Sequence, residues 1–333
     1  MKRLPLTKDW FHGAVSLERR EEGLKPWRIP FRDYELYPPE GIGGKAAISA
    51  GVRLRLRTDS SAVSVTFAPL DEAAVMDCLA EGERIGTICL PAGAEEACFS
   101  GLPDGMKELE IWLPANVGIT VAGIAIDAEA AAHPLPDTRP HWIAYGSSIT
   151  QCVAASGPSR SWPAIAASAS GYQLTSLGFS GNCHMEPMIG RLIRDLPADF
   201  ISLCVGVNMY GAETVSPRMF RPLLIGLLET IRDRHRDIPL LVISPVYGTI
   251  REHEANILGF TLPLMREAIR ETVGLLRKRG DRQLYYMNGL DWLGPEDEAL
   301  LTDGLHPGAE GFEVMGWRFP GLMKGVFGHT ERG

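Results

Sequence analysis

The sequence predicts an α/β protein of two domains: a β-sandwich of jelly-roll type over residues 1–135, and a three-layer α/β/α domain with a parallel five-stranded sheet over residues 136–333. Residues 1–135 contain many short segments in which polar and apolar residues alternate, and no convincing helix. The remaining residues alternate buried apolar runs with amphipathic helical patterns, which is typical of a parallel sheet covered on both faces. A length of 333 residues also favours two domains over one.

The composition excludes several classes of partner. The chain has 33 Lys+Arg against 41 Asp+Glu, a net charge of -8 without long runs of either sign, which argues against a nucleic-acid or anionic-membrane partner. No stretch approaches the ~20 apolar residues of a membrane span, and the amino terminus lacks the apolar core of a secretory signal. Six cysteines without paired C-x-x-C spacing predict reduced thiols, no zinc site and a cytoplasmic protein.

The amino-terminal part is predicted to be built of strands. Residues 52–57 and 62–67 both alternate and are separated by Asp59-Ser60-Ser61, which predicts a hairpin with one buried face. Further strands are expected at residues 84–90, 107–113 and 119–126, and the proline-containing segment 128–140 is expected to be a linker. Trp10, Trp27 and Trp112 are candidate sugar-stacking residues, but core or interface positions are favoured for all three.

The carboxyl-terminal part is predicted to contain five strands separated by helices. The expected strands are residues 142–145, 172–177, 200–205, 240–243 and 283–287. Helices are expected after Ser161 and Ser216, at about 186–195, at 262–276, and after Glu310. A common flavodoxin-like order for such a sheet is 2-1-3-4-5, which places the ends of the first and third strands beside each other at a crevice.

Candidate catalytic residues follow the ends of these strands. Ser148 follows the first strand, Gly181 the second and Asn208 the third, while Asp303 and His306 lie in the segment TDGLHP. A serine hydroxyl is a weak nucleophile until a base takes its proton, and a carboxylate three residues before a histidine can orient that base. The backbone N–H groups of Ser148 and Gly181 and the side-chain amide of Asn208 are candidate donors to an oxyanion.

Four short blocks carry a resemblance to a known family. The blocks G-S-S-I-T, G-F-S-G-N, V-G-V-N and D-G-L-H-P, in this order, resemble those of the SGNH (GDSL-like) hydrolases and span residues 141 to about 328. The β-rich front resembles the amino-terminal domain of a subgroup that includes acyl-transferring polyketide-tailoring enzymes and carbohydrate esterases. Ser147 and Met209 stand where the family usually has aspartates, but neither aspartate is the nucleophile, base or oxyanion donor.

The resemblance implies a serine esterase that needs neither a metal nor an organic cofactor. It assigns Ser148 as nucleophile, His306 as base, Asp303 as the residue that orients His306, and Ser148, Gly181 and Asn208 as the oxyanion hole. No long apolar insertion follows any block, so a small-molecule substrate with a short acyl group, acetyl foremost, on a carbohydrate or polyol is expected. The alternatives are an acyltransferase with the same residues, a lipase or thioesterase, and an inactive carbohydrate-binding protein. The oligomeric state cannot be predicted.

Overall fold

The computed structural model describes residues 1–328 and divides the chain into two compact units. The first unit comprises Met1–Arg139 and Ser156–Arg160, and the second comprises Pro140–Ala155 and the chain from Ser161 onward. The sequence predicts a domain boundary between residues 135 and 136. No helix within residues 1–328 has both the length and the apolar character that a membrane span requires.

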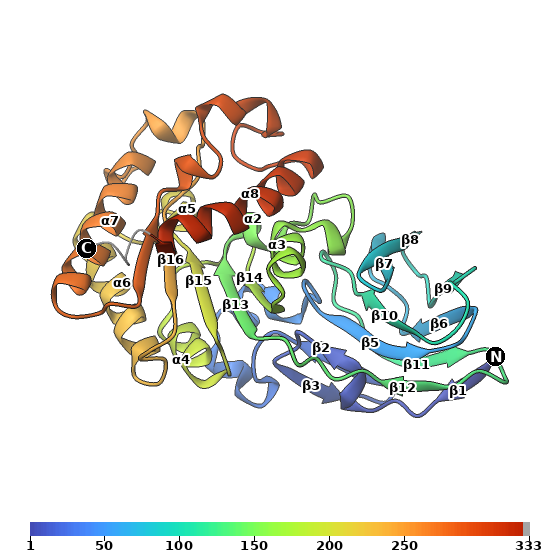
Figure 1. The fold of residues 1–333 in the computed structure, drawn as a ribbon. Coiled ribbons are helices and arrows are strands. Elements are labelled where there is room, and N and C mark those ends of the chain that lie inside the picture. Colours follow the sequence, from blue (N-terminus) through green and yellow to red (C-terminus); the bar gives the residue numbers. More distant parts are fainter. Residues whose placement is uncertain (329–333) are drawn as a thin grey trace. The chain divides into compact units, whose positions relative to one another are not determined.

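The first unit consists mainly of two antiparallel sheets, each with six strands (Figure 1). One sheet has the order β3-β4-β11-β6-β9, with β1 paired to β11, and the other has the order β12-β5-β10-β7-β8, with β2 paired to β5. The strands of the first sheet are β1 (Lys2–Leu4), β3 (Ser16–Arg19), β4 (Leu24–Trp27), β6 (Ala62–Phe67), β9 (Glu96–Ser100) and β11 (Val121–Ile126). Those of the second are β2 (Phe11–His12), β5 (Arg53–Thr58), β7 (Ala74–Ala80), β8 (Glu83–Leu90), β10 (Lys107–Trp112) and β12 (Ala132–Pro134). A short helix, α1 (Glu40–Gly43), lies between β4 and β5.

A single hydrophobic core lies within this β-sandwich. Both sheets contribute fully buried side chains to it, among them Leu54 and Ile111 from one sheet and Val65 from the other. The three tryptophans considered as sugar-stacking residues are also buried, with Trp10 3% exposed and Trp27 and Trp112 each 5% exposed. Their burial agrees with the favoured core or interface positions, and Trp10 belongs to the core of the sandwich.

The predicted hairpin between residues 52–57 and 62–67 is wrong. Both segments are strands, but β5 and β6 belong to opposite sheets and do not pair with each other. The turn between them is held by Asp127, whose Oδ2 accepts hydrogen bonds from the Ser61 N–H at 2.8 Å and the Ser60 hydroxyl at 3.0 Å. This anchor at the end of β11 directs the chain from one sheet to the other.

Two arginines of β5 are buried although the alternating pattern predicts that they face solvent. Arg53 is 1% and Arg55 7% exposed. Arg55 Nε lies 2.9 Å from Glu110 Oε1, and Arg53 Nη2 lies 3.2 Å from Asp137 Oδ2, so both charges are paired. Asp137 and β12 both lie in the segment that the sequence analysis interprets as a linker, so this segment is part of the first unit.

The second unit contains a parallel sheet of five strands in the order β14-β13-β15-β16-β17 (Figure 1). The strands are β13 (His141–Gly146), β14 (Gln173–Gly178), β15 (Phe200–Cys204), β16 (Leu240–Ile243) and β17 (Leu284–Met287). All five predicted strands are present within one or two residues of their expected ends, and the order 2-1-3-4-5 is confirmed. The carboxyl ends of β14, β13 and β15 therefore lie side by side.

Helices flank this sheet. They are α2 (Ser148–Gln151), α3 (Trp162–Ser170), α4 (Pro187–Asp195), α5 (Val207–Gly211), α6 (Pro217–Arg232), α7 (Leu262–Lys278) and α8 (Ala309–Gly328). Helix α3 packs on α8, whereas α6 packs on both α4 and α7. An aromatic cluster anchors α8: the Phe319 ring stacks on Trp142 of β13 with centroids 5.2 Å apart, and Trp162 of α3 contacts both rings.

Candidate active site

Ser148 lies at the start of a short helix that crosses the ends of two strands. Strand β13 ends at Gly146, and α2 begins at Ser148. A Cβ atom on Gly178, the last residue of β14, would lie only 2.4 Å from the backbone nitrogen of Gln151, so only glycine lets α2 pass this close to β14. The tight turn holds the Ser148 side chain at the carboxyl edge of the sheet.

Both departures from the usual family pattern have a local explanation. Ser147 is the N-cap of α2, and its hydroxyl accepts a hydrogen bond from the Ile149 N–H at 3.3 Å, a role for which serine and aspartate are about equally suited. Ser147 is fully buried, and a neutral hydroxyl loses less on burial than a carboxylate does. Met209 is also fully buried in α5, so its side chain contributes apolar packing.

Ser148, His306 and Asp303 form a continuous chain of hydrogen bonds. Ser148 Oγ lies 2.9 Å from His306 Nε2, and His306 Nδ1 lies 2.7 Å from Asp303 Oδ2. An ionised Asp303 accepts the Nδ1 proton, which leaves the lone pair of Nε2 directed at the serine hydroxyl. The structure thus brings together three residues that the sequence separates by as many as 158 positions.

Asp303 is held in its charged form by the loop around it. Its Oδ1 accepts hydrogen bonds from the backbone N–H of His306 at 2.7 Å and of Leu305 at 3.0 Å. The His306 N–H foremost, with the His306 ring and the Leu305 N–H, lowers the pKa of Asp303 to about 2. The loop is closed by a hydrogen bond from the Thr302 N–H to the His306 carbonyl. As predicted, the segment is irregular rather than helical.

The three predicted oxyanion donors follow adjacent strand ends. Within residues 1–328, the backbone N–H groups of Ser148 and Gly181 have no acceptor. Asn208 lies in the first turn of α5, and its Oδ1 accepts a hydrogen bond of 3.0 Å from the Cys183 N–H. This bond fixes the side chain. The Nδ2 group donates to no acceptor within residues 1–328. Gly181 has a φ of +72°, and a Cβ built on it meets nothing within 4 Å, so this position opens onto free space.

Three further residues hold these donors in place, and none of them belongs to the four sequence blocks; His184 is expected from the sequence only as a residue close to Gly181 that could line the pocket. Gln151 is 2% exposed, and its Oε1 accepts the Ser180 N–H at 3.0 Å, which ties α2 to the loop of Gly181. His184 Nε2 donates to the Gly181 carbonyl at 3.0 Å, while its Nδ1 accepts from the Thr214 hydroxyl at 2.9 Å. Gln151 lies three residues after the serine, but a buried amide has no distinctive sequence pattern.

Substitution of Asn208 tests the third donor. If the Nδ2 group stabilises an oxyanion, Asn208→Ala should lower kcat by about 10² to 10³ with little change in KM, because the bond strengthens only as charge develops. Steady-state kinetics on an activated acetate ester measure the effect, with Asn116→Ala in the first unit as the matched control. An effect confined to KM would instead identify Asn208 as a residue that positions the substrate.

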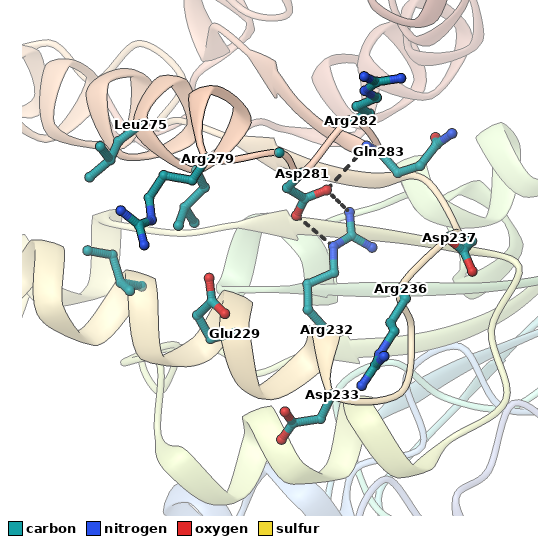
Figure 2. Close-up of a pocket in the computed structure, with 13 residues that line it drawn as sticks. Glu229, Arg232, Asp233, Arg236, Asp237, Leu275, Arg279, Asp281, Arg282 and Gln283 are labelled. Carbon is teal, nitrogen blue, oxygen red and sulfur yellow. Dashed lines mark hydrogen bonds and ion pairs between the residues drawn. The ribbon is translucent and has the colours of Figure 1, made fainter.

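The second unit also has a groove of about 1010 Å³ that is separate from this cluster (Figure 2). It lies between the carboxyl-terminal halves of α6 and α7 and the segment that leads into β17. Arginines and carboxylates line it in mixed order, and Arg232 points at Asp281, with Nε 2.8 Å from Oδ2 (Figure 2). This groove contains neither a serine nor a histidine, so it lacks the groups that the catalytic hypothesis needs.

Comparisons with known proteins agree with this geometry. The GDSL-like Lipase/Acylhydrolase family matches residues 140–316, and the family described as the SsfX3 N-terminal domain matches residues 10–119. No curated protein matches the chain.

Several solved structures are similar to the chain over most of its length. A salicylyl-acyltransferase, SsfX3, from a tetracycline biosynthetic pathway is 36% identical, with a TM-score of 0.89 over 95% of this chain and 94% of that one. A protein described as a GDSL-like lipase from Bacteroides ovatus is 23% identical, with a TM-score of 0.80 over 96% and 95% of the two chains. A family two carbohydrate esterase from Clostridium thermocellum is 16% identical, with a TM-score of 0.67 over 84% and 94%. The last two likenesses show the fold alone.

The family match covers more than half of the chain and includes every residue of the hydrogen-bonded cluster. The resemblance inferred from the four blocks is therefore confirmed, and so is the fold of the two units. The chain belongs to the GDSL-like lipase/acylhydrolase family and has an amino-terminal domain of the SsfX3 type.

Proposed function

We propose that this chain is a serine acyl hydrolase that acts through a covalent acyl-enzyme. Ser148 Oγ attacks the carbonyl carbon of an ester while His306 Nε2 takes the serine proton. The resulting oxyanion is held by the N–H groups of Ser148 and Gly181 and the amide of Asn208. Collapse breaks the ester bond, and His306 returns the proton to the leaving alcohol. Water then adds by the same route and releases the carboxylic acid, so no metal or organic cofactor takes part.

One observation carries this proposal: the hydrogen-bonded chain from Ser148 through His306 to Asp303. Its distances of 2.9 and 2.7 Å are hydrogen-bond distances, so the base already lies within reach of the serine proton before the reaction begins. A serine with only a structural role in a turn does not require a hydrogen bond to a histidine. Here the other nitrogen of that histidine is also bound to a carboxylate with a pKa of about 2. An inactive carbohydrate-binding protein would not need this arrangement either.

For the substrate, we propose a short acyl group, acetyl foremost, on a carbohydrate or polyol. The segments that follow the four blocks contain no long apolar insertion able to cover a long acyl chain. Each methylene left in water forgoes about 0.8 kcal/mol, so a long chain would gain little over a short one. Carbohydrate esterases occur among the proteins that share the fold, which supports a carbohydrate alcohol.

A series of p-nitrophenyl esters from acetate to palmitate tests the acyl preference. We expect kcat/KM to be highest for acetate and to decrease steadily as the chain lengthens. A maximum at octanoate or longer would reject this proposal in favour of a lipase or thioesterase.

A second candidate function, acyl transfer, is favoured by one specific finding. The relative that is 36% identical over 95% of this chain is described as a salicylyl-acyltransferase. The same residues would form the acyl-enzyme, and an alcohol would then replace water as the acceptor. Product analysis of the acetate reaction with an added polyol separates the two, because a transferase produces the new ester while a hydrolase produces acetic acid.

A further inference from the structure

We propose that Arg251 determines substrate specificity, because its guanidinium group binds a carboxylate carried by the ester that reacts at Ser148. This inference rests on the proposed function and narrows it, since it adds a charged group to the substrate. It follows from where Arg251 lies, from what holds its side chain, and from the charges around it.

The backbone next to Arg251 is fastened to the catalytic loop. Arg251 lies in a single turn of 3-10 helix, Ile250–Glu252, on the connection between β16 and α7. Thr249 directly precedes this turn, and its N–H donates a hydrogen bond of 2.9 Å to the carbonyl of Gly304. Gly304 lies between Asp303 and His306 in the chain. The position of Arg251 is therefore coupled to the loop that carries the base.

The side chain of Arg251 is directed at the helix that carries Asn208. Its Nη1 donates to the Val207 carbonyl at 3.3 Å, and its guanidinium lies over the Tyr210 ring, 5.1 Å from the centroid. Tyr210 is itself fixed, because its hydroxyl donates to the Glu254 carbonyl at 2.9 Å. Arg251 thus lies between the oxyanion side of the cluster and the loop of the base, and its orientation is set in advance.

The charge of Arg251 has no counter-ion among residues 1–328. No carboxylate of residues 1–328 lies within 4.0 Å of the guanidinium. Apart from the bond to the Val207 carbonyl, its N–H groups have no acceptor among these residues. Burial lowers the pKa of Arg251, while Tyr210 and Asp303 oppose that change. Asp303 is already engaged with His306, and Arg251 remains charged because arginine keeps its proton throughout the neutral range.

A neighbouring arginine, Arg266, has a carboxylate partner of the kind that Arg251 lacks among residues 1–328. Arg266 of α7 is 7% exposed, and its guanidinium forms hydrogen bonds with both carboxylate oxygens of Glu252 and with two backbone carbonyls. Arg251, which directly precedes Glu252 in the chain, has a single backbone acceptor among residues 1–328. A half-buried guanidinium whose planar set of donors is free favours a carboxylate, which it can bind through two parallel hydrogen bonds.

Paired esters that differ only in a carboxylate test this inference. For the alcohol portion, the pair is 4-acetoxybenzoate and 4-acetoxybenzamide, and for the acyl portion it is p-nitrophenyl hydrogen adipate and p-nitrophenyl hexanoate. The measured quantity is the ratio of kcat/KM for the charged ester to that for its neutral partner. Arg251→Gln should lower this ratio about 10- to 100-fold in one of the two pairs, mainly through KM, and that pair identifies which portion carries the carboxylate.

Two further variants separate recognition from a structural role. Arg251→Lys keeps the charge but not the paired donors, so it should retain part of the ratio. Arg270→Gln, which removes an exposed arginine paired with Glu267 on α7, should leave the ratio unchanged. An equal loss on both members of a pair, or an unchanged ratio in both pairs, would overturn the inference while leaving the proposed function intact. A wild-type chain that cleaves none of the four esters would overturn both.

Discussion

Ser148→Ala is expected to reduce ester hydrolysis to background, because loss of the nucleophile from a serine triad costs about 10⁴ to 10⁶ in turnover. The fold should survive, since the Ser148 side chain makes one hydrogen bond within residues 1–328, to His306, and contributes little to packing. Steady-state kinetics on p-nitrophenyl acetate measure the loss, and a thermal unfolding midpoint close to the wild-type value shows that the fold is intact.

A matched control for this variant is Ser216→Ala. Ser216 is the N-cap of α6, its side chain makes no capping hydrogen bond, and it lies outside the cluster. This variant should keep wild-type turnover. Purified Ser148→Ala enzyme with near-normal turnover would rule out Ser148 as the nucleophile.

Asp303→Asn is expected to lower kcat by about 10³ to 10⁴, because an asparagine amide that donates to His306 Nδ1 stabilises the wrong tautomer. Nε2 would then carry the proton and could not accept one from Ser148. The lowered pKa of Asp303, about 2, keeps the wild-type carboxylate charged at any pH used for assay. A loss of wild-type activity on acidification above about pH 4 should therefore not report protonation of Asp303.

The matched control for this substitution is Asp237→Asn, which changes an exposed carboxylate in the groove of Figure 2. It should leave both kcat and the pH profile unchanged. If Asp303→Asn kept kcat within about tenfold of wild type, the orienting role assigned to Asp303 would be wrong.

Much of the second unit could be predicted because its signals are local. Buried parallel strands read as largely apolar runs, as in β13, β15, β16 and β17, and all five strands are bounded by glycine, proline or a capping residue. The strand order then follows from a common topology, and it brings the ends of β13, β14 and β15 together. The short helices α2 and α5 were missed, because four or five residues are too few to show a helical period.

The first unit could be predicted only in part, because its organisation depends on distant partners. Alternation correctly identifies β5 and β6 as strands, but it does not reveal which strand pairs with which. The turn between them is held by Asp127, which lies more than sixty residues away in the chain. Arg53 and Arg55 are buried for a similar reason, since Glu110 and Asp137 supply their counter-charges from distant segments.

The contacts of the residues that support the site could not be predicted from the sequence either. Ser148, Asp303 and His306 are found from motifs, whereas the contacts of Gln151, His184 and Arg251 depend on the folded chain. Arg251 in particular lies outside all four blocks, and only its contacts with Val207 and Tyr210 reveal its position. The specificity role proposed for Arg251 therefore rests on a connection whose sequence has no recognisable pattern.

The most direct test of the central claim is covalent labelling of the wild-type chain with a fluorophosphonate. An activated serine attacks phosphorus and displaces fluoride, which leaves a stable adduct on Oγ. Mass spectrometry of the intact chain should show one added phosphonyl group, peptide mapping should place it on Ser148, and both Ser148→Ala and prior protonation of His306 at acid pH should prevent it. An unlabelled wild-type chain, or an adduct on any residue other than Ser148, would contradict the account.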